Sequence, residues 1–248
     1  MLINKIEELS MNAWPSIQTK LYDGWVLRFS DGYTKRANSV NPIYESTIKL
    51  DEKIDFCEKQ YSLFDIPAVF KLTGESNPKG IDKRLEERGY TKIDETSVKI
   101  LNLKQYTYNE PKDIKIETNF SDEWIDGFFW CSCIDKRDQT AARKILGNIM
   151  GEVICVTRYE NKEFAGCGFC AIERGFAGIF DIVVEKSHRR KGYGKEIISS
   201  ILSEAYKKGV RTTYLQVVVG NTPAERLYDK LGFNEAYRYW YRKQEKFQ

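Results

Sequence analysis

The chain has 248 residues, of which 42% are hydrophobic, and 39 basic residues against 36 acidic residues leave a formal net charge of +3. This apolar content excludes a disordered chain, and the near balance of charge excludes a nucleic-acid protein that binds through bulk positive charge. Charges occupy the first eight residues, where a signal peptide needs an apolar core, and no apolar run approaches the ~18 residues of a membrane span, so we expect a soluble cytoplasmic protein without a membrane partner.

The first half of the chain contains a hairpin signal followed by a helical pattern. The stretch Trp25–Pro42 predicts a β-hairpin that turns at Asp31-Gly32, because this pair favours the positive φ angles of a tight turn. A helix is predicted from about Tyr44 to Tyr61. This helix follows Asn41-Pro42 without any glycine.

The second half alternates between strand and helix patterns, which predicts a mixed α/β class. Strands are predicted at Asp113–Thr118, Val153–Tyr159, Phe164–Ile172, Gly178–Val184, Thr212–Val219 and Asn234–Arg242. Helices are predicted at Asp122–Cys131, Gln139–Met150 and Glu196–Lys208, and from a start at Thr222-Pro223 with Thr222 as a cap. Asn161-Lys162 and Arg174-Gly175 fit hairpin turns.

A weak internal repeat divides the chain. The stretch Ser76–Tyr90 parallels Gly220–Phe233, since both predict a turn with Asn and Pro, a helix, a glycine and an aromatic residue. We expect two similar halves, residues 1–108 and 109–248, with the boundary in the polar stretch Tyr106–Pro111. The alternative is that chance or a common topology produces the same short pattern twice.

Six cysteines include two close pairs, Cys131-x-Cys133 and Cys167-x-x-Cys170. The first pair lies in a helical pattern, where residues two apart face different ways. The second lies in a strand pattern, where an odd offset places the side chains on opposite faces. We therefore expect small buried or half-buried residues and no metal, against the alternative of a zinc or redox site.

A basic glycine loop, Arg189-x-x-Gly192-x-Gly194, stands between a predicted strand and a predicted helix. Glycines let the backbone approach an anion, the helix start offers unpaired N–H groups, and basic side chains add full charge. The order of residues differs from the dinucleotide-binding and P-loop patterns. The loop is typical of a phosphate site, and the alternative is a solvated basic turn.

With Asn221, Tyr228 and Leu231-Gly232-Phe233 following in order, this loop resembles the Gcn5-related N-acetyltransferase (GNAT) superfamily, most closely from Ile179 to Phe233. The resemblance implies a mixed sheet whose two central parallel strands, Ile179–Val184 and Thr212–Val219, splay apart. It also implies acetyl-CoA as cofactor, without a metal. The first half would be a degenerate copy that lacks the basic glycine loop.

The resemblance also implies which residues hold acetyl-CoA. Pantetheine would lie in the gap between the splayed strands and pair with main-chain groups of Ile182 and Val184. Asn221 would bind the pantetheine arm, or alternatively only cap the turn before Pro223. The residues expected around the pyrophosphate are Arg189, Arg190, Lys191, Gly192, Tyr193, Gly194 and Lys195.

The chemistry implied is direct transfer of acetyl to an amine. Tyr228 is the expected general acid for the leaving thiolate, because a phenol can donate to a thiolate whose conjugate thiol has a pKa near 8.5. A base is harder to assign. The resemblance places a Glu at Gln216 in the branch that acetylates ribosomal proteins, and near Gly178 in the histone branch, and this chain has neither.

Asp181 is the remaining candidate base, since a charge within an apolar strand is costly without a purpose. The alternatives are an Asp that pairs with an Arg or caps a main-chain group, and a water chain to solvent. His188 is the only histidine, and it stands beside the phosphate loop rather than where the amine must lie.

The acceptor is expected to be the amine of a small molecule or a peptide, without a nucleic-acid partner. The stretch that ends Arg36-Ala-Asn-Ser-Val-Asn-Pro resembles the N-terminal region of some bacterial tandem acetyltransferases, so Arg28, Arg36 and Asn38 are candidates for an acceptor pocket, or they only shape the hairpin. A monomer is favoured, because tandem halves replace a dimer. The rival functions are a coenzyme A-binding sensory module and a transferase for another acyl group.

Overall fold

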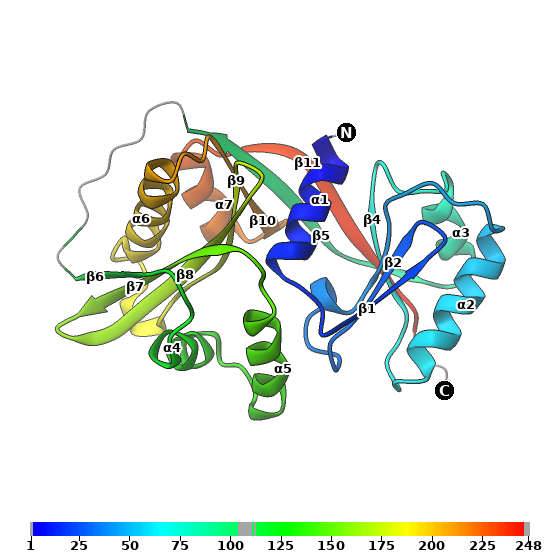
Figure 1. Ribbon diagram of the computed structural model, residues 1–248, viewed down its shortest axis with the longest axis horizontal. Coiled ribbons are helices and arrows are strands. Elements are labelled where there is room, and N and C mark those ends of the chain that lie inside the picture. The colour runs from blue at the N-terminus through cyan, green and yellow to red at the C-terminus, as the bar shows by residue number, and fades with distance from the viewer. Residues whose placement is uncertain (1, 104–110, 112, 246–248) are drawn as a thin grey trace. The chain divides into compact units, whose positions relative to one another are not determined.

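The computed structural model describes residues 2–103, 111 and 113–245 of the chain. The chain forms two compact units: unit 1 contains residues 1–97 and 237–248, and unit 2 contains residues 98–236. Helices alternate with strands in both units (Figure 1), and the mixed α/β class predicted from the sequence is confirmed. The predicted boundary, Tyr106–Pro111, lies outside the described residues apart from Pro111 itself.

Unit 1 takes its strands from both ends of the chain. In it, the strand order is β1-β2-β3-β4-β11-β5, and β3 and β4 run parallel. Residues 91–97 of β5 and residues 237–243 of β11 fall in unit 1. The elements are α1 (Leu2–Ala13), β1 (Gln18–Tyr22), β2 (Trp25–Phe29), β3 (Val40–Pro42), α2 (Leu50–Ser62), β4 (Val69–Thr73), α3 (Ile81–Glu87), β5 (Thr91–Asn102) and β11 (Asn234–Lys243).

The prediction of a hairpin in unit 1 is wrong about the position of the tight turn. β2 and β3 do pair antiparallel, from Trp25↔Pro42 to Leu27↔Val40. Asp31 and Gly32 have the expected positive φ angles of 52° and 78°, but they begin a longer connection that contains the short 3-10 helix Lys35–Ala37. The tight turn lies one strand earlier, between β1 and β2, where Asp23 and Gly24 have φ angles of 41° and 81°.

The helix expected from Tyr44 begins only at Leu50, as α2. The residues before it are held by Asp23, whose carboxylate accepts hydrogen bonds from the N–H groups of Thr47 and Ile48 at 3.0 and 2.9 Å. From Leu50 onward, α2 buries Ile54, Cys57 and Tyr61 in the core of the unit, together with residues of β2 and β4.

Unit 2 contains the elements predicted in the second half of the chain in the predicted order, except the last strand, β11, which belongs to unit 1 from Tyr237 onward. Its strand order is β5-β10-β9-β8-β7-β6. The elements are β6 (Ile114–Glu117), α4 (Asp122–Ser132), α5 (Lys136–Gly147), β7 (Glu152–Glu160), β8 (Glu163–Glu173), β9 (Phe176–Val184), α6 (Tyr193–Lys207), β10 (Thr212–Val218) and α7 (Thr222–Lys230).

The apolar face predicted for α6 forms the core of unit 2. Ile197, Ile201 and Leu202 are fully buried against strand residues such as Ile179 and Leu215. Each such side chain stabilises the fold by roughly 1.5–3 kcal/mol relative to an exposed one. Gly209 ends the helix with a φ of 84°, as predicted. This packing fixes the start of α6 against the end of β9.

The repeat seen in the sequence corresponds to the same succession of elements in both units. Strand β4 leads through α3 to β5, and strand β10 leads through α7 to β11. Gly89 and Gly232, with φ angles of 81° and 90°, close the two helices. The cap predicted at Thr222 is wrong by one residue, because Asn221 is the N-cap and Thr222 is already helical.

The cysteine pairs do not converge on a site. Cys170 lies in the core that packs on α6, whereas the pKa of the buried Cys167 thiol is raised by burial first and then by Cys131 of α4 and by Asp181. The prediction of opposite faces is therefore confirmed. Among the residues that the structure describes, no group of three or more His, Cys, Asp or Glu side chains could hold a metal ion.

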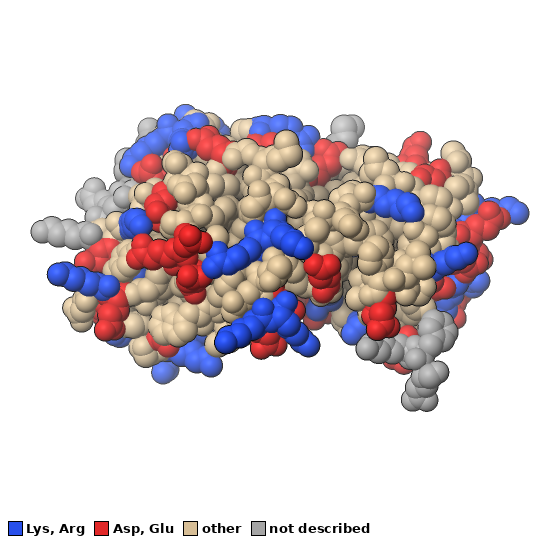
Figure 2. All heavy atoms as spheres, turned by 60° about the horizontal axis from the view of Figure 1, so that its bottom comes forward, with Lys and Arg blue, Asp and Glu red and all other residues tan. Residues whose placement is uncertain are grey.

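The surface carries both signs of charge. Figure 2 shows Lys and Arg side chains interspersed with Asp and Glu over the face that it presents, in agreement with the formal net charge of +3. Within residues 2–103, 111 and 113–245, no helix is both long enough and apolar enough to cross a membrane.

Candidate active site

The candidate site begins where strands β9 and β10 part. These two parallel strands pair over four residues each, from Thr212↔Phe176 to Leu215↔Ile179. The pairing ends there, although β9 continues to Val184 and β10 to Val218. The splayed central strands predicted from the sequence are thus present, with Ile182 and Val184 half-buried along the unpaired part of β9.

A β-bulge lies in β9 beside this gap. The pairing of β8 with β9 shifts between Cys167↔Val183 and Phe169↔Phe180, so that Asp181 and Ile182 together face Gly168. Asp181 has a φ of 51°, in the left-handed region that aspartate tolerates better than most residues. A Cβ on Gly168 would lie 2.3 Å from Ile182 Cδ1, so a larger residue opposite the bulge would force the Ile182 side chain to move.

The basic glycine loop connects β9 to α6. Arg190 and Gly192 have φ angles of 65° and 92°, which turn the chain back before α6 begins at Tyr193. Gly192 is the N-cap, and no side chain caps this helix start. Its N–H groups and the positive end of its dipole therefore face a space that an anion can fill. A Cβ on Gly192 would meet no heavy atom within 4 Å, which confirms that the space is open.

The basic side chains of the loop are exposed, and one of them contacts the unpaired edge of β9. The Nε atom of Arg189 donates to the main-chain oxygen of Val184 at 3.1 Å. This carbonyl was predicted to pair with pantetheine. It retains a second lone pair, so it can accept from a ligand amide as well.

In the structure, the charge of one predicted catalytic side chain, Asp181, acts on the other, Tyr228. Tyr228 of α7 is half-buried, and its ring meets the edge of Phe233 with 6.2 Å between centroids. Burial, and after it the negative charge of Asp181, raise the pKa of Tyr228 to about 12. The phenol is therefore protonated throughout the neutral range, as a proton donor must be.

Two further predicted residues lie at the end of β10. Asn221 is exposed, and its side chain makes no cap hydrogen bond although it occupies the N-cap position of α7. This excludes the capping role that was its alternative. Gln216 is half-buried on the part of β10 that has left its partner strand.

Gly178 cannot be replaced by a carboxylate base. It pairs with Tyr214 of β10, and a Cβ at position 178 would lie 2.4 Å from the Tyr214 hydroxyl oxygen. Asp181 is the single acidic residue in β9. The carboxylate nearest to the gap on this strand is therefore the one at the bulge.

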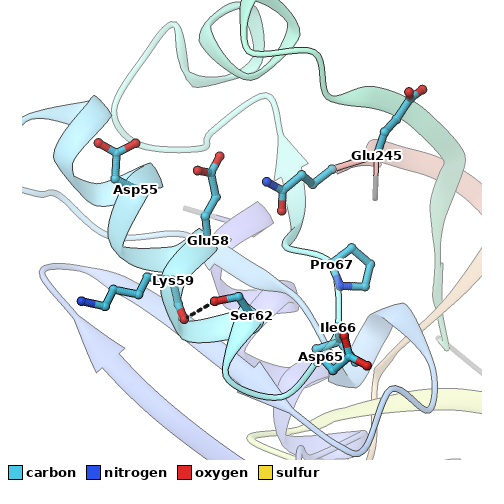
Figure 3. A pocket seen from close by; sticks show the side chains of 9 residues that line it. Asp55, Glu58, Lys59, Ser62, Asp65, Ile66, Pro67 and Glu245 are labelled. Atoms are coloured by element: carbon cyan, nitrogen blue, oxygen red, sulfur yellow. Dashed lines mark hydrogen bonds between the residues drawn. The ribbon is translucent and has the colours of Figure 1, made fainter. Parts of the chain in front are cut away.

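Unit 1 contains a separate cavity of about 600 Å³, which none of the predicted site residues lines (Figure 3). Three of its carboxylates, those of Asp55, Glu58 and Glu245, are already engaged. Arg88 pairs with Glu58 at 3.0 Å and also with Asp55, and Glu245 accepts the hydroxyl hydrogen of Thr91 at 2.9 Å.

The contacts of Arg28 and Asn38 in unit 1 are structural. The buried Arg28 guanidinium donates to three main-chain carbonyls, those of Met11, Trp14 and Arg36. The buried side chain of Asn38 accepts from the N–H of Ser30 at 2.7 Å and donates to the carbonyl of Tyr33 at 2.7 Å. These bonds fix the connection between β2 and β3.

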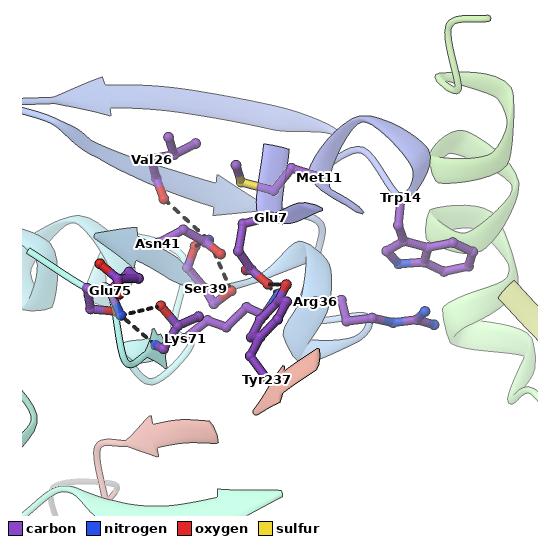
Figure 4. Close-up of polar contacts among 12 residues, drawn as sticks. Glu7, Met11, Trp14, Val26, Arg36, Ser39, Asn41, Lys71, Glu75 and Tyr237 are labelled. Carbon is purple, nitrogen blue, oxygen red and sulfur yellow. Dashed lines mark hydrogen bonds and ion pairs between the residues drawn. The ribbon is translucent and has the colours of Figure 1, made fainter. Parts of the chain in front are cut away.

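Arg36 is half-buried, and its guanidinium carbon lies 4.5 Å from the ring centroid of Trp14 (Figure 4). Close to it, Glu7 of α1 forms a buried ion pair with Lys71 of β4 at 2.5 Å and accepts the Tyr237 hydroxyl at 2.7 Å (Figure 4). The pair is buried on both sides, so removal of either partner would leave an uncompensated charge.

Sequence reasoning missed Glu160, which contacts the loop. Its carboxylate, at the end of β7, accepts from Lys191 Nζ at 2.9 Å and from the Tyr193 hydroxyl at 2.5 Å. In the sequence, a charged residue just before the turn at Asn161-Lys162 is typical of a solvated hairpin end. The one signal in the sequence is the predicted hairpin, because its second strand, β8, pairs with β9 and so brings the end of β7 near the loop.

Comparison with known proteins gives a consistent result over almost the whole chain. Residues 2–242 match a family model described as "Probable histone acetyltransferase Rv0428c C-terminal". The chain is 29% identical to the uncharacterized N-acetyltransferase YobR of Bacillus subtilis, over 97% of this chain and 98% of that protein.

Two more similarities concern the fold and a shorter stretch of the chain. A GCN5-related N-acetyltransferase from Kribbella flavida has the same fold, with a TM-score of 0.72 and 15% identity over 98% of this chain and 96% of that one. The ribosomal protein bS18-alanine N-acetyltransferase of Escherichia coli is 34% identical over 77 residues, which cover 31% of this chain and 52% of that enzyme.

Proposed function

The chain belongs to the family of the Rv0428c C-terminal acetyltransferase model, within the GNAT superfamily of N-acetyltransferases, and we propose that it transfers acetyl from acetyl-CoA to a primary amine. The observation that carries this proposal is the gap between β9 and β10, which opens beside an uncapped helix start and the Tyr228 hydroxyl.

The residues present fit coenzyme A. The open space at Gly192 and the uncapped start of α6 suit a pyrophosphate, and the exposed Arg189, Arg190, Lys191 and Lys195 add positive charge. Main-chain groups of Ile182 and Val184 would pair with the pantetheine amides, as a sheet edge pairs with an added strand. Asn221, whose side chain does not cap α7, would bind the same arm.

Bound acetyl-CoA would supply an activated thioester. Attack of the amine nitrogen on the acetyl carbon would break the carbon–sulfur bond and leave its electron pair on sulfur. Tyr228 would donate its hydroxyl proton to that sulfur, and its phenolate would take up, through water, the second proton that the nitrogen releases as the amide forms. A pKa of about 12 makes Tyr228 a weak acid, but the phenol remains protonated wherever the enzyme works.

Asp181 would receive the proton that the amine must lose. A free alkyl amine has a pKa near 10, so it arrives as an ammonium ion. The carboxylate at the bulge attracts this cation and takes the proton directly or through one water molecule. The position next to the gap, and the steric exclusion of a carboxylate at Gly178, favour Asp181 in this role.

The acceptor is proposed to be a primary amine on a small molecule or a peptide. Gln216, on the unpaired part of β10, would contact it through its amide group. The similarity to the bS18-alanine enzyme covers about a third of this chain, so the acceptor of that enzyme is one candidate among amines rather than an assignment.

Two measurements test the proposal. Calorimetric titration with acetyl-CoA should give a saturable heat and a higher melting temperature. Release of free thiol should then appear with at least one member of a panel of polyamines, aminoglycosides and peptides. The absence of heat and of a thermal shift at millimolar acetyl-CoA would refute the function, and a response only to a longer acyl-CoA would change the acyl group.

A further inference from the structure

Two side chains at the end of strand β7 hold the first residue of α6. The guanidinium carbon of Arg158 lies 4.3 Å from the ring centroid of Tyr193, and Glu160 accepts the hydroxyl of the same tyrosine at 2.5 Å. Arg158 is nearly buried, and its Nε also donates to Glu196 in the first turn of α6 at 2.6 Å.

Glu160 also holds the loop that precedes α6. Besides Tyr193, its carboxylate contacts Lys191 Nζ at 2.9 Å and His188 Nε2 at 2.8 Å. The other ring nitrogen of His188 lies 3.2 Å from Glu185 Oε2, at the opposite end of the loop. The Tyr193 hydroxyl and then Lys191 hold the pKa of Glu160 below its usual range, so the carboxylate is ionised at neutral pH.

The loop needs this support because its own backbone is unfavourable. Arg190 adopts a left-handed φ of 65°, which a residue with a Cβ rarely occupies, and Gly192 at 92° has a wide choice of other conformations. Loops of this kind lose conformational entropy when they are ordered by a ligand, and that loss weakens binding. A loop that already has its bound shape before the ligand arrives avoids this loss of entropy.

We propose that Glu160 is a positioning residue for acetyl-CoA: through Lys191, Tyr193 and His188 it keeps the basic glycine loop in its anion-binding shape before the cofactor arrives. This inference rests on the proposed function. Glu160 itself need not touch the cofactor, since its contacts are with side chains and leave the main-chain N–H groups of the helix start to the pyrophosphate.

Glu160 also has an opposing effect, because its charge offsets that of Lys191 and reduces the attraction of the loop for phosphate. Lys191 is 46% exposed, so solvent and salt screen this pair. The hydrogen bond from the Tyr193 hydroxyl is partly buried, so salt weakens it less than it weakens the Lys191 pair. We therefore expect the loss of positioning to exceed the gain in positive charge.

The test compares Glu160→Gln with Glu163→Gln. Glu163 stands on the other side of the same turn and is exposed, so its variant makes the same change of charge without the loop contacts. Glu160→Gln should raise the Kd for acetyl-CoA about three- to tenfold, with kcat at saturating cofactor unchanged. S-acetylpantetheine, which lacks the pyrophosphate, should react equally well with both variants and with the wild type.

A second readout needs no cofactor. Amide hydrogen exchange over residues 186–194 should be faster in Glu160→Gln than in the wild type, and unchanged in Glu163→Gln. Tyr193→Phe, which removes a single donor, should give the same effects at smaller size.

Three results would overturn the positioning role: an unchanged Kd, a lower Kd, or an equal loss with S-acetylpantetheine. If the wild type itself fails to bind acetyl-CoA, the proposed function fails. If the wild type binds and Glu160→Gln binds equally well, only the role of Glu160 is refuted.

Discussion

The two units make the same turn from strand to helix, but they satisfy its N–H groups differently. In unit 1, β3 leads to α2, and the carboxylate of Asp23 accepts from the N–H groups of Thr47 and Ile48. Those residues stand two positions and one position before the N-cap Lys49. Lys53 adds its ammonium group to the same carboxylate at 3.0 Å. Unit 1 therefore supplies an anion from its own chain.

In unit 2, the two positions before the N-cap Gly192 are Arg190 and Lys191, within the proposed pyrophosphate loop. A carboxylate from the corresponding hairpin is present here too. Glu160, however, binds side chains of the loop rather than its main-chain N–H groups. The main-chain N–H groups before and at the start of α6 are therefore left to a ligand. We call such a set of N–H donors at a helix start a cradle.

A second difference lies one helix later. Counted back from the closing glycines Gly232 and Gly89, the position of Tyr228 in unit 2 is that of Leu85 in unit 1, which is fully buried. Unit 1 thus has an occupied cradle and no phenol. The comparison teaches that a shared topology provides the geometry of a site, whereas the bonding of a few N–H groups decides whether a ligand can use it.

The largest effect expected is the loss of cofactor binding when the open cradle is filled. Gly192→Glu places a side chain and a negative charge in the space beside the helix start. The Kd for acetyl-CoA should rise at least about 100-fold, which is about 2.7 kcal/mol. Calorimetry would measure it.

Gly209→Glu is the matched control for this change. Gly209 has a similar φ, 84° against 92°, and a Cβ there also meets no atom within 4 Å, but it ends α6 instead of starting it. Both variants should lose a similar stability of about 1–2 kcal/mol from backbone strain. Equal acetyl-CoA affinity in the two variants would contradict the assignment of the loop.

The next largest effect concerns the phenol that unit 1 lacks. Tyr228→Phe should lower kcat about 10- to 100-fold, at the low end for a general acid because a thiolate leaves readily. The Kd for acetyl-CoA should change little, since the ring and its packing remain. Steady-state kinetics with free-thiol detection would measure kcat, and Tyr206→Phe on α6 serves as the control. A kcat equal to that of the wild type would remove Tyr228 from the chemistry.

Replacing the carboxylate that accepts the N–H groups of unit 1 by a weaker hydrogen-bond acceptor should lower the stability of the fold without changing acetyl-CoA binding. Asp23→Asn should lower the melting temperature and leave the Kd for acetyl-CoA unchanged. The N–H of Ile48 first, with Thr47 and Lys53, holds the pKa of Asp23 well below its usual range. A carboxylate with a lowered pKa stabilises the fold above pH ~4 and loses this effect as the pH falls further.

The difference in melting temperature between wild type and Asp23→Asn should therefore be full at pH 7 and shrink below pH ~4. Asp31→Asn, at an exposed turn residue that also has a positive φ of 52°, should melt like the wild type throughout. A tighter Kd for acetyl-CoA in Asp23→Asn, with a second binding event, would show that the two cradles are more alike than proposed.

The smallest effect expected is on the pH profile: kcat of the wild type should stay constant as the pH becomes alkaline. Because the pKa of Tyr228 is raised to about 12, the phenol stays protonated up to that range, so kcat should not fall between pH 7 and 10. A kcat profile of the wild type across this interval would check it. A descending limb near pH 9 that disappears in Tyr228→Phe would mean that the bound cofactor lowers this pKa.

Those parts of the fold that depend on neighbouring residues could be predicted from the sequence. The apolar face of α6, its end at Gly209 and the hairpin turn at Asn161-Lys162 follow from periodicity and turn chemistry, and all are present. The late start of α2 could not be predicted, because it depends on Asp23, which is 24 residues before Thr47. The same applies to the long connection after Asp31, because Arg28, which holds this connection at Arg36, also donates to Met11 and Trp14, 17 and 14 residues earlier in the chain.

The candidate site shows the same division. The loop from Arg189 to Gly194 and the spacing of Asn221 and Tyr228 are local patterns, so the sequence was sufficient to propose them. Glu160 is 31 residues before Lys191, and only the pairing of β7, β8 and β9 brings the two together. The steric conflict between Gly178 and Tyr214 likewise depends on the register of β10 with β9.

The strand composition of unit 1 has a consequence for biosynthesis. Strand β11 pairs with β4 from Tyr239↔Thr73 to Lys243↔Val69, so unit 1 is completed by the last strand among the described residues. Residues 1–97 leave the ribosome with one edge of β4 unpaired, and an exposed strand edge is prone to aggregation. Unit 2 is continuous in sequence and can close first. A stop codon before Tyr237 therefore removes little of the proposed active unit, yet it leaves β4 of unit 1 without its partner strand.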